Sequence, residues 1–390
     1  MAFAMFTLPY SMRKYIMNSY YPNPEHDPSA EYSRHYDREA RRKRRRKRIL
    51  MRRLRVLSAV LLLGLTVTAA VALIDRQPEA VETPPAEQAM ISLPAPDPDP
   101  IIEEPAEPEW AITYTENSAQ VRDDFPSQYV ILMDLESGEV LAQRDPKAVI
   151  NPASMTKILT LLVSAEHVTD EMLENGTFTM TRAIGDYCFV NKCSNVGYEV
   201  DEVIPVKELF FGCILCSGAD ACLGLAETIF GSHEAIVDAM NAKVAELGLS
   251  EKTHFTNCIG LYDPDLHCTV EEMAIILKAA LENDFCREVL NTITYQSLPT
   301  DHHPEGQVLS NLFSRRIQYQ DTGSVTVSAA KTGYVEESGF CAASYGTTAD
   351  GREYLCVTGK STGTQQSIKD HAELYRTYCP KAEVVTTETA

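Results

Sequence analysis

The stretch VILMDLESGEVLAQRDPKAVINPASMTKILT, residues 130–160, decides the fold that this sequence predicts. It begins with two apolar runs separated by the turn residues Glu136-Ser-Gly138, a pattern typical of a β-hairpin. Asn151-Pro152 then interrupts the strand pattern, and apolar residues recur with helical spacing over Ala153–Val168. Because the first turn of a helix tolerates proline, the stretch predicts a hairpin followed directly by a helix.

The patterns further along the chain divide into a helical middle and a strand-rich end. Thr269 and Glu272 have the spacing of a capping box at the start of one helix. The order of elements, without an internal repeat, predicts an α+β fold in which an antiparallel sheet is flanked by helices and joined by a helical subdomain. Helices are predicted at Val206–Phe230, His233–Gly248, Thr269–Asn283 and Ser367–Tyr378, and strands at Val325–Lys331, Phe340–Thr347 and Glu353–Lys360.

The charge of the chain is divided unevenly, and the division indicates a membrane topology. Residues 1–55 contain 15 Lys and Arg against 5 Asp and Glu, whereas the rest contains 20 against 50. Residues 56–74 (VLSAVLLLGLTVTAAVALI) are uncharged, and as a helix they would extend roughly 28 Å, which matches the core of a bilayer. The positive-inside rule then places residues 1–55 in the cytoplasm and residues 75–390 outside.

Two other interpretations of residues 56–74 remain open. The small residues Thr68-Ala-Ala70 or Ala70-Val-Ala72 could mark signal-peptide cleavage, although a 55-residue leader and a long apolar run favour a retained anchor. A buried globular helix is disfavoured by the adjoining block of positive charge. We therefore expect a single transmembrane signal anchor.

The regions beside the predicted span have compositions that cannot form a core. Residues 1–55 predict a disordered basic tail, whose run Arg41–Arg48 favours anionic lipid over nucleic acid because it adjoins a membrane span. Residues 75–109 are dense in Pro, Glu and Asp and predict an extended spacer. The folded domain is expected at residues 110–379, followed by a polar tail at residues 380–390.

All 11 cysteines follow the predicted span, where disulfides are permitted, and their odd number leaves at least one thiol unpaired. Cys188 and Cys193 are the pair that we would most readily expect to be bridged. Cys213 and Cys216 form a C-x-x-C that could indicate a redox pair or half a zinc site. Their apolar neighbours favour buried core thiols instead. With no metal-ligand spacing and no phosphate-binding glycine loop, we expect neither a metal nor another cofactor.

Three short motifs carry the candidate chemistry: Ser154-Met-Thr-Lys157, Ser217-Gly-Ala219 and Lys331-Thr-Gly333. A serine hydroxyl needs a base within hydrogen-bond reach to become a nucleophile. Residues three apart share a helix face, so Lys157 can present its amine to Ser154. This amine must lose its proton, which burial and a nearby second cation such as Lys331 favour. A surface Ser and Lys on an ordinary amphipathic helix are the alternative for the first motif taken alone.

The third motif suits the edge of a sheet beside a cleft. Gly333 lets a substrate backbone approach closely, Thr332 can donate to a carboxylate, and Lys331 supplies a positive charge. The N–H group of Tyr334 is available for one half of an oxyanion hole. A buried lysine satisfied by an acid is the structural alternative.

In this order the motifs resemble those of penicillin-binding proteins and serine β-lactamases. The stretches GCILCSGADACLGLAE, THFTNCIGLYDPDLHCT and SAAKTGYVEESGFC are closer still to low-molecular-mass D-Ala-D-Ala carboxypeptidases, and the resemblance covers roughly residues 128–378. It implies a β-lactamase/transpeptidase-like fold, a peptidoglycan stem peptide as substrate, β-lactams as inhibitors and a bacterial cell membrane as location. By position, Ser154 would be the nucleophile acylated by the penultimate D-Ala, Lys157 the general base and Ser217 a proton relay.

The resemblance also implies how substrate would be held. Lys331-Thr-Gly333 would bind the terminal carboxylate, and the N–H groups of Ser154 and Tyr334 would form the oxyanion hole. The chain departs from the family at Ala219, where the second motif normally ends in Asn. Losing that amide would cost about 2–3 kcal/mol of transition-state stabilisation, so we expect slow turnover. Asp220 cannot substitute, because one step along a helix turns its side chain by about 100°.

Two further functions stay open. A penicillin-binding fold without turnover could serve as a cell-wall binding or scaffold module. A β-lactamase is disfavoured because no Glu-x-x-x-Asn element lies between Ser217 and Lys331. His267 lies where the family has a His near the cleft, and a structural role is favoured over proton transfer. The acidic charge beyond the span argues against a nucleic-acid partner.

Overall fold

The computed structural model describes residues 111–380. The predicted basic tail, membrane span and spacer at residues 1–109 lie outside the described residues, as does the polar tail beyond residue 380. Within the described part of the chain, no helix combines the length and apolarity needed to cross a bilayer.

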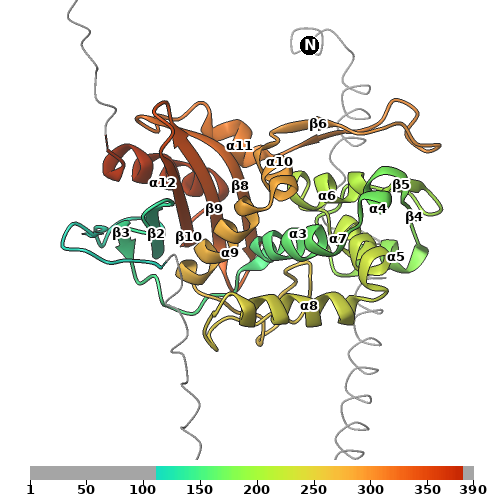
Figure 1. Ribbon diagram of the computed structural model, residues 1–390, viewed down its shortest axis with the longest axis horizontal. Helices are drawn as coiled ribbons and strands as arrows, with labels where there is room; N and C mark the ends of the chain where they lie inside the picture. Colours follow the sequence, from blue (N-terminus) through green and yellow to red (C-terminus); the bar gives the residue numbers. More distant parts are fainter. Residues whose placement is uncertain (1–110, 381–390) are drawn as a thin grey trace, which may run out of the picture. The chain divides into compact units, whose positions relative to one another are not determined.

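A six-stranded sheet lies on the left of the described domain in Figure 1, beside a group of helices. The strand order is β1-β3-β2-β10-β9-β8, which places β8 at an edge. Neighbours are antiparallel except β1 and β3, so the sheet is mixed and the prediction of an antiparallel sheet was wrong at this end. The strands are β1 (Ala119–Gln120), β2 (Tyr129–Asp134), β3 (Val140–Arg144), β8 (Val325–Val335), β9 (Gly339–Thr348) and β10 (Glu353–Ser361).

Helices and two small hairpin-like sheets make up the rest of the described chain. The small sheets are β4 (Thr177–Thr179) with β5 (Val203–Pro205), and β6 (Thr294–Gln296) with β7 (Val308–Ser310). The helices are η2 (Ala153–Met155), α3 (Thr156–His167), α4 (Asp170–Asn175), α5 (Arg182–Val190), α6 (Val206–Leu215), α7 (Ala219–Leu225), η3 (Ala226–Phe230), α8 (His233–Glu246), α9 (Val270–Glu282), α10 (Asp284–Asn291), α11 (Leu312–Ile317) and α12 (Thr364–Tyr378).

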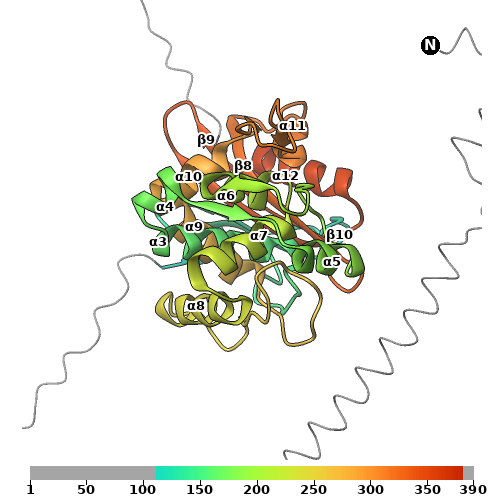
Figure 2. The same ribbon diagram turned by 90° about the vertical axis from the view of Figure 1, so that its right-hand side faces the viewer.

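Helices cover both faces of the main sheet (Figures 1 and 2). On one face α11 and α12 pack on β8, β9 and β10; on the other, α9 and α10 contact the sheet and α3 packs against α9. Side chains of one strand alternate between these layers, as the two-residue period of a strand requires: Ile131 belongs to the core under α3 and α9, and Leu132 to the core under α12. Helix α8 lies outside α3, at the edge of the molecule.

Most predicted elements are confirmed, and two boundaries are corrected. The hairpin of β2 and β3, the helix at His233 and the Thr269 cap are present; the Thr269 hydroxyl accepts from the Glu272 N–H at 3.0 Å. The helix predicted at Val206–Phe230 is divided into α6 and α7, because the chain turns at Cys216–Gly218, and α7 continues directly into η3. The strand predicted to end at Lys331 continues to Val335 along β9.

The turn before α3 is held in a strained conformation. Ala153 has φ 47°, a left-handed value that is uncommon for a residue with a Cβ. Asn151 fixes this turn by accepting from the Ala153 N–H at 3.0 Å and donating to the Leu266 carbonyl at 2.8 Å. Gly260 packs so closely that a Cβ built on it would lie 2.0 Å from the Ala153 carbonyl oxygen. The position of residue 154 therefore depends on a close backbone contact.

Gly260→Ala tests this contact, and Gly351→Ala is the matched control. Both glycines have positive φ, but a Cβ at Gly351 would meet nothing within 4 Å. We expect Gly351→Ala to lower the free energy of unfolding by about 1 kcal/mol through backbone strain, and Gly260→Ala by about 3 kcal/mol because the clash adds to that strain. Urea denaturation measures both values. Equal losses in the two variants would contradict the close packing at Ala153.

Candidate active site

Ser154 and Lys157 meet at the start of the central helix, as their spacing predicts. Ser154 lies in the single turn η2, and Lys157 follows in the first turn of α3. The Lys157 Nζ donates to the Ser154 Oγ at 3.1 Å and to the Ile259 carbonyl at 2.5 Å. Only 2% of Lys157 is exposed, so its amine is almost fully withdrawn from water. The contact to Ile259 fixes the amine and leaves it directed at the serine hydroxyl.

A second lysine–serine contact lies on the opposite wall. Ser217 lies in the turn between α6 and α7 with φ 55°, and not inside a helix as the sequence predicts. Lys331 reaches across from the edge strand β8, and its Nζ donates to the Ser217 Oγ at 2.8 Å. It also donates to the Thr332 carbonyl at 2.8 Å. No acid contacts Lys331 among the described residues, so the alternative of a lysine satisfied by an acid does not hold.

Burial and the repulsion between two neighbouring amines lower a pKa in this site. Burial, followed by the positive charge of Lys157, lowers the pKa of Lys331 from its usual value of 10.5 to about 7. The lysine whose lowered pKa the structure shows is thus Lys331, the partner of Ser217. A neutral amine beside a serine hydroxyl can therefore exist near neutral pH.

A cleft of about 290 Å³ connects these groups. Ser154, Ser217, Thr332 and Gly333 line it, and so does Tyr334, whose ring stacks on Phe340 with centroids 4.4 Å apart. The backbone of Gly333 lies against the turn that carries Ser154: a Cβ on Gly333 would be 2.6 Å from the Pro152 carbonyl oxygen. The third motif thus borders the nucleophile, as predicted for an edge strand beside a cleft.

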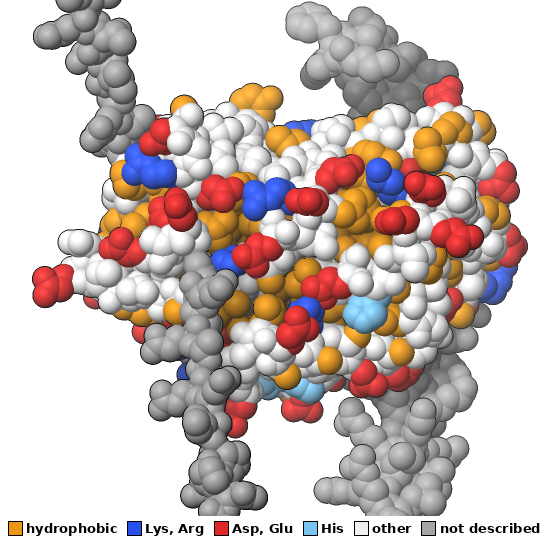
Figure 3. Space-filling model, in the orientation of Figure 1, with side chains coloured by type: hydrophobic (Ala, Val, Ile, Leu, Met, Phe, Trp, Pro, Cys, Tyr) orange, Lys and Arg blue, Asp and Glu red, His pale blue; other side chains and the backbone are white. Residues whose placement is uncertain are grey.

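The cleft has further lining residues that no sequence motif marked. Lys192 and Ser194 come from the loop after α5, and Thr364 and Ser367 come from the first turns of α12. No motif or periodicity in the sequence predicts that these residues line the cleft, because only the tertiary packing brings their segments close to β8. No acidic residue is among the described residues that line the cleft. Elsewhere acidic side chains are widely spread, as on the face in Figure 3.

Ala219 faces the same site without an amide. It lines a narrower part of the cleft, of about 150 Å³, together with Ser154 and Lys157. The Asp220 carboxylate points elsewhere and accepts the N–H groups of Val196 at 2.9 Å and Gly197 at 3.1 Å. As the sequence predicts, Asp220 does not replace the missing amide.

The cysteines and the histidine that the sequence singled out have structural contacts or are free thiols, and of these Cys193 lines the narrower part of the cleft. Of the C-x-x-C pair, Cys213 is buried as predicted, whereas Cys216 is only partly buried. The Cys213 Sγ lies 3.2 Å from that of Cys222, and the residues that are described contain no cluster of three or more His, Cys, Asp or Glu able to hold a metal. The Nδ1–H group of His267 donates to the Lys252 carbonyl oxygen at 2.7 Å, a structural contact. Cys188 and Cys193 are free thiols in this structure.

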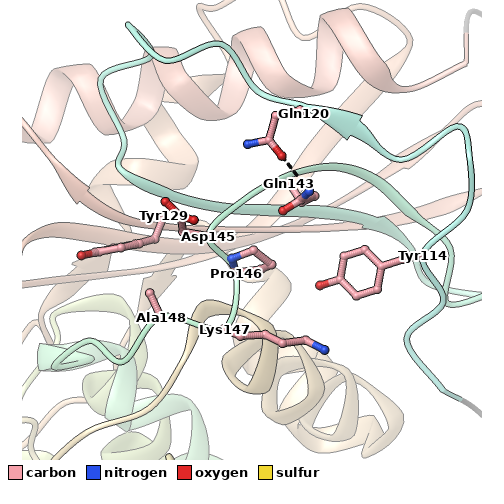
Figure 4. Close-up of a pocket in the computed structure, with 8 residues that line it drawn as sticks. All are labelled: Tyr114, Gln120, Tyr129, Gln143, Asp145, Pro146, Lys147 and Ala148. Carbon is pink, nitrogen blue, oxygen red and sulfur yellow. Dashed lines mark hydrogen bonds between the residues drawn. The ribbon is translucent and has the colours of Figure 1, made fainter.

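A second, larger pocket carries none of the motif residues. It lies beside β3 and the segment that follows it, and Figure 4 shows Tyr114 and Tyr129 on opposite sides of Gln143 and Pro146. The Gln143 amide donates to the Gln120 carbonyl oxygen at 2.7 Å across it. Without a nucleophile–base pair in its lining, this pocket is not the candidate active site.

The mixed sheet between two helical layers is the α+β architecture of a transpeptidase-like protein. The D-alanyl-D-alanine carboxypeptidase family matches residues 115–362, almost all of the described domain, and the chain belongs to that family. D-alanyl-D-alanine carboxypeptidase DacF of Bacillus subtilis is 30% identical over 241 residues, which are 61% of this chain and 59% of DacF. The chain thus spans less than two thirds of that relative.

Solved structures agree on the fold. A D-alanyl-D-alanine carboxypeptidase from Mycobacterium tuberculosis H37Rv is 26% identical with a TM-score of 0.57, covering 67% of this chain and 94% of that one. The Streptomyces K15 DD-transpeptidase is 22% identical with a TM-score of 0.57, covering 66% of this chain and 98% of its own. The second likeness concerns the fold alone.

Lys331→Met tests the buried amine. Because the folded state releases this proton near pH 7 and an unfolded lysine near 10.5, the unfolded state binds more protons between those values, and stability is lost as the pH falls through them. As the pH rises between those two values, we expect the free energy of unfolding of the wild type to increase by about 1.4 kcal/mol per pH unit relative to that of the Met variant. Urea denaturation at about pH 7.5 and about pH 9.5 measures it, with Lys360→Met, at an exposed lysine of β10, as control. A pH-independent difference for Lys331→Met would refute the shift.

Proposed function

We propose that this protein is a serine D-Ala-D-Ala carboxypeptidase that removes the terminal D-Ala of peptidoglycan stem peptides through an acyl-enzyme on Ser154. The observation that carries the proposal is the 3.1 Å contact from the Lys157 amine to the Ser154 hydroxyl, in a cleft whose other serine, Ser217, accepts from Lys331. The described residues that line the two parts of the cleft include Lys157 and Lys192 and no acid, although the whole chain has a net charge of −20. Such a cleft suits a peptide that ends in a carboxylate.

Acylation follows from these positions. Neutral Lys157 takes the proton of the Ser154 hydroxyl, and the oxygen attacks the carbonyl carbon of the penultimate D-Ala. The N–H groups of Ser154 and Tyr334 are proposed to stabilise the oxyanion. Thr332 and Lys331 hold the terminal carboxylate, which places the scissile bond over Ser154. Gly333 allows the substrate backbone to lie beside the turn at Pro152.

Release of D-Ala requires a proton on the leaving nitrogen. Ser217 is suited to relay it, because its hydroxyl accepts a hydrogen bond from Lys331 and lines the same cleft as Ser154. The carbon–nitrogen bond then breaks, and the acyl group stays on Ser154 as an ester. Water, with Lys157 again as base, hydrolyses the ester and regenerates the serine.

Ala219 is the one feature that favours a second function. Its methyl group faces Ser154 and Lys157 where an amide would hold substrate and hydrogen-bond the lysine. A loss of about 2–3 kcal/mol would slow the reaction by roughly 30- to 150-fold without removing the nucleophile. We therefore favour slow turnover, and a non-hydrolytic cell-wall binding module is the alternative. No comparable observation favours a β-lactamase.

The site of action is proposed from the sequence. Residues 56–74 would anchor the chain in a bacterial cell membrane, with the basic tail in the cytoplasm and the domain outside, where peptidoglycan lies. Penicillins and other β-lactams, which are acylating analogues of the substrate, would react at the same serine.

Ser154→Ala tests the nucleophile. A fluorescent penicillin should label the wild-type chain covalently and leave the variant unlabelled, because alanine has no oxygen to acylate. Denaturing gel electrophoresis separates the covalent adduct from bound reagent. Ser164→Ala, at a buried serine of α3, the helix that follows the turn of Ser154, serves as control and should keep its label. Labelling of Ser154→Ala at the wild-type level would refute the assignment.

Ala219→Asn distinguishes a slow enzyme from a binding module. We expect the purified wild-type protein to release D-Ala slowly from a pentapeptide, and the variant to do so roughly 30- to 150-fold faster, because the amide restores about 2–3 kcal/mol in the transition state. A coupled assay for free D-Ala measures both rates. No release from the wild type, with penicillin labelling intact, would favour the binding module.

A further inference from the structure

Two thiols meet on the wall of the candidate active site. Cys193 lines the narrow part of the cleft with Ser154 and Lys157, and it is only partly buried. Cys188 lies behind it in the last turns of α5 and is 3% exposed. The Cys193 thiol is thus open to the cleft, and Cys193 covers the Cys188 thiol.

The backbone explains why these side chains are adjacent. The Cys193 N–H donates to the Cys188 carbonyl at 3.0 Å, and the Lys192 N–H donates to the Phe189 carbonyl at 3.2 Å. Lys192, between them, has the left-handed φ of 53°. These two bonds and this conformation form a Schellman motif at the end of α5. In this motif a residue of the last helical turn, here Cys188, contacts the second residue beyond the helix end, here Cys193. That contact is usually apolar, and here both positions are cysteines.

The two thiols differ in reactivity. A hydrogen bond from the Cys188 thiol, reinforced by the positive charge of Lys157, lowers the pKa of Cys193 to about 7 despite the opposing effects of burial and of Asp220. The hydrogen bond to Cys193 and burial raise the pKa of Cys188 well above its usual value. Thiol–disulfide exchange needs a thiolate that can reach the reagent, and such sites often have a resolving cysteine beside them.

We propose that Cys193 is a site of reversible thiol modification inside the catalytic cleft, with Cys188 as its resolving cysteine. The co-reactant is a low-molecular-mass disulfide, RSSR. The Cys193 thiolate attacks one sulfur, forming Cys193–S–S–R as the R–S–S–R bond breaks and one RS⁻ leaves. Cys188 then gives its proton to solvent and attacks the Cys193 sulfur, forming the Cys188–Cys193 disulfide and releasing the second RS⁻. Two protein thiols are oxidised and one disulfide is reduced.

The intermediate and the product differ in their effect on the cleft. In the mixed disulfide, the R group lies in the narrow space of about 150 Å³ shared with Ser154 and Lys157, and it hinders the approach of substrate. Resolution by Cys188 removes the R group and reopens the cleft. This effect on acylation rests on the proposed function, whereas the thiol chemistry does not.

The experiment treats the full-length protein with 4,4′-dithiodipyridine, whose released thiopyridone is followed by absorbance. In the fast phase we expect the wild type to release two thiopyridones per chain and Cys188→Ser one, because only the wild type can resolve the adduct. Cys193→Ser should have no fast phase. Cys216→Ser, at a half-buried cysteine outside the cleft lining, should match the wild type. Peptide mass spectrometry then locates the adduct or the disulfide.

Three outcomes would overturn the proposal: a fast phase that survives in Cys193→Ser, two thiopyridones from Cys188→Ser, or an adduct mapped first to Cys216. Where penicillin labels the unmodified protein, the Cys188→Ser adduct should be labelled at least about tenfold more slowly than the resolved wild type; equal rates would refute the blocking of the cleft. Failure of penicillin to label even the unmodified protein would contradict the proposed function and leave the thiol result standing.

Discussion

The site depends on keeping two lysine amines out of water and close to one another. Each amine has a serine hydroxyl as partner, Ser154 for Lys157 and Ser217 for Lys331, and neither has an acid among the described residues. An acidic side chain of the protein placed between the two amines would favour their protonated forms, and neither could then act as a base. The cost of burying positive charge without a counter-ion is therefore what makes the chemistry available.

The rest of the fold serves to hold these groups in place. Lys331 comes from an edge strand, Ser217 from the turn between two helices, and Ser154 from a strained turn before a third helix. Ser217 itself has a left-handed backbone conformation, and Ser154 follows Ala153, which has one too. Close packing maintains both conformations. Gly260 and Gly333 supply that packing by bringing their backbones against the turn that carries Ser154. Apolar cores on both faces of the sheet then fix the strand and the helices relative to each other.

Much of this arrangement could be predicted where the signal was local. The hairpin, the helix with Ser154 and Lys157, and the Thr269 cap follow from short-range patterns, and all are present. The break at Ser217 was missed because apolar residues continue across it and hide the turn. The parallel pairing of β1 was missed because a two-residue strand has no period to detect. Lys192 and Ser194 gave no signal, because only the end of α5 brings them to the cleft.

The pH dependence of penicillin acylation tests most directly whether the lysine pair supplies the base. The second-order rate constant for labelling of the wild-type protein should rise with pH along a limb with an apparent pKa near 7, because that is where Lys331 loses its proton. Arg in place of Lys331 keeps a charge that does not titrate, so it should abolish this limb. A rate that is constant between about pH 5 and about pH 9, with Ser154 labelled throughout, would contradict the account, because the base would then not be this buried pair.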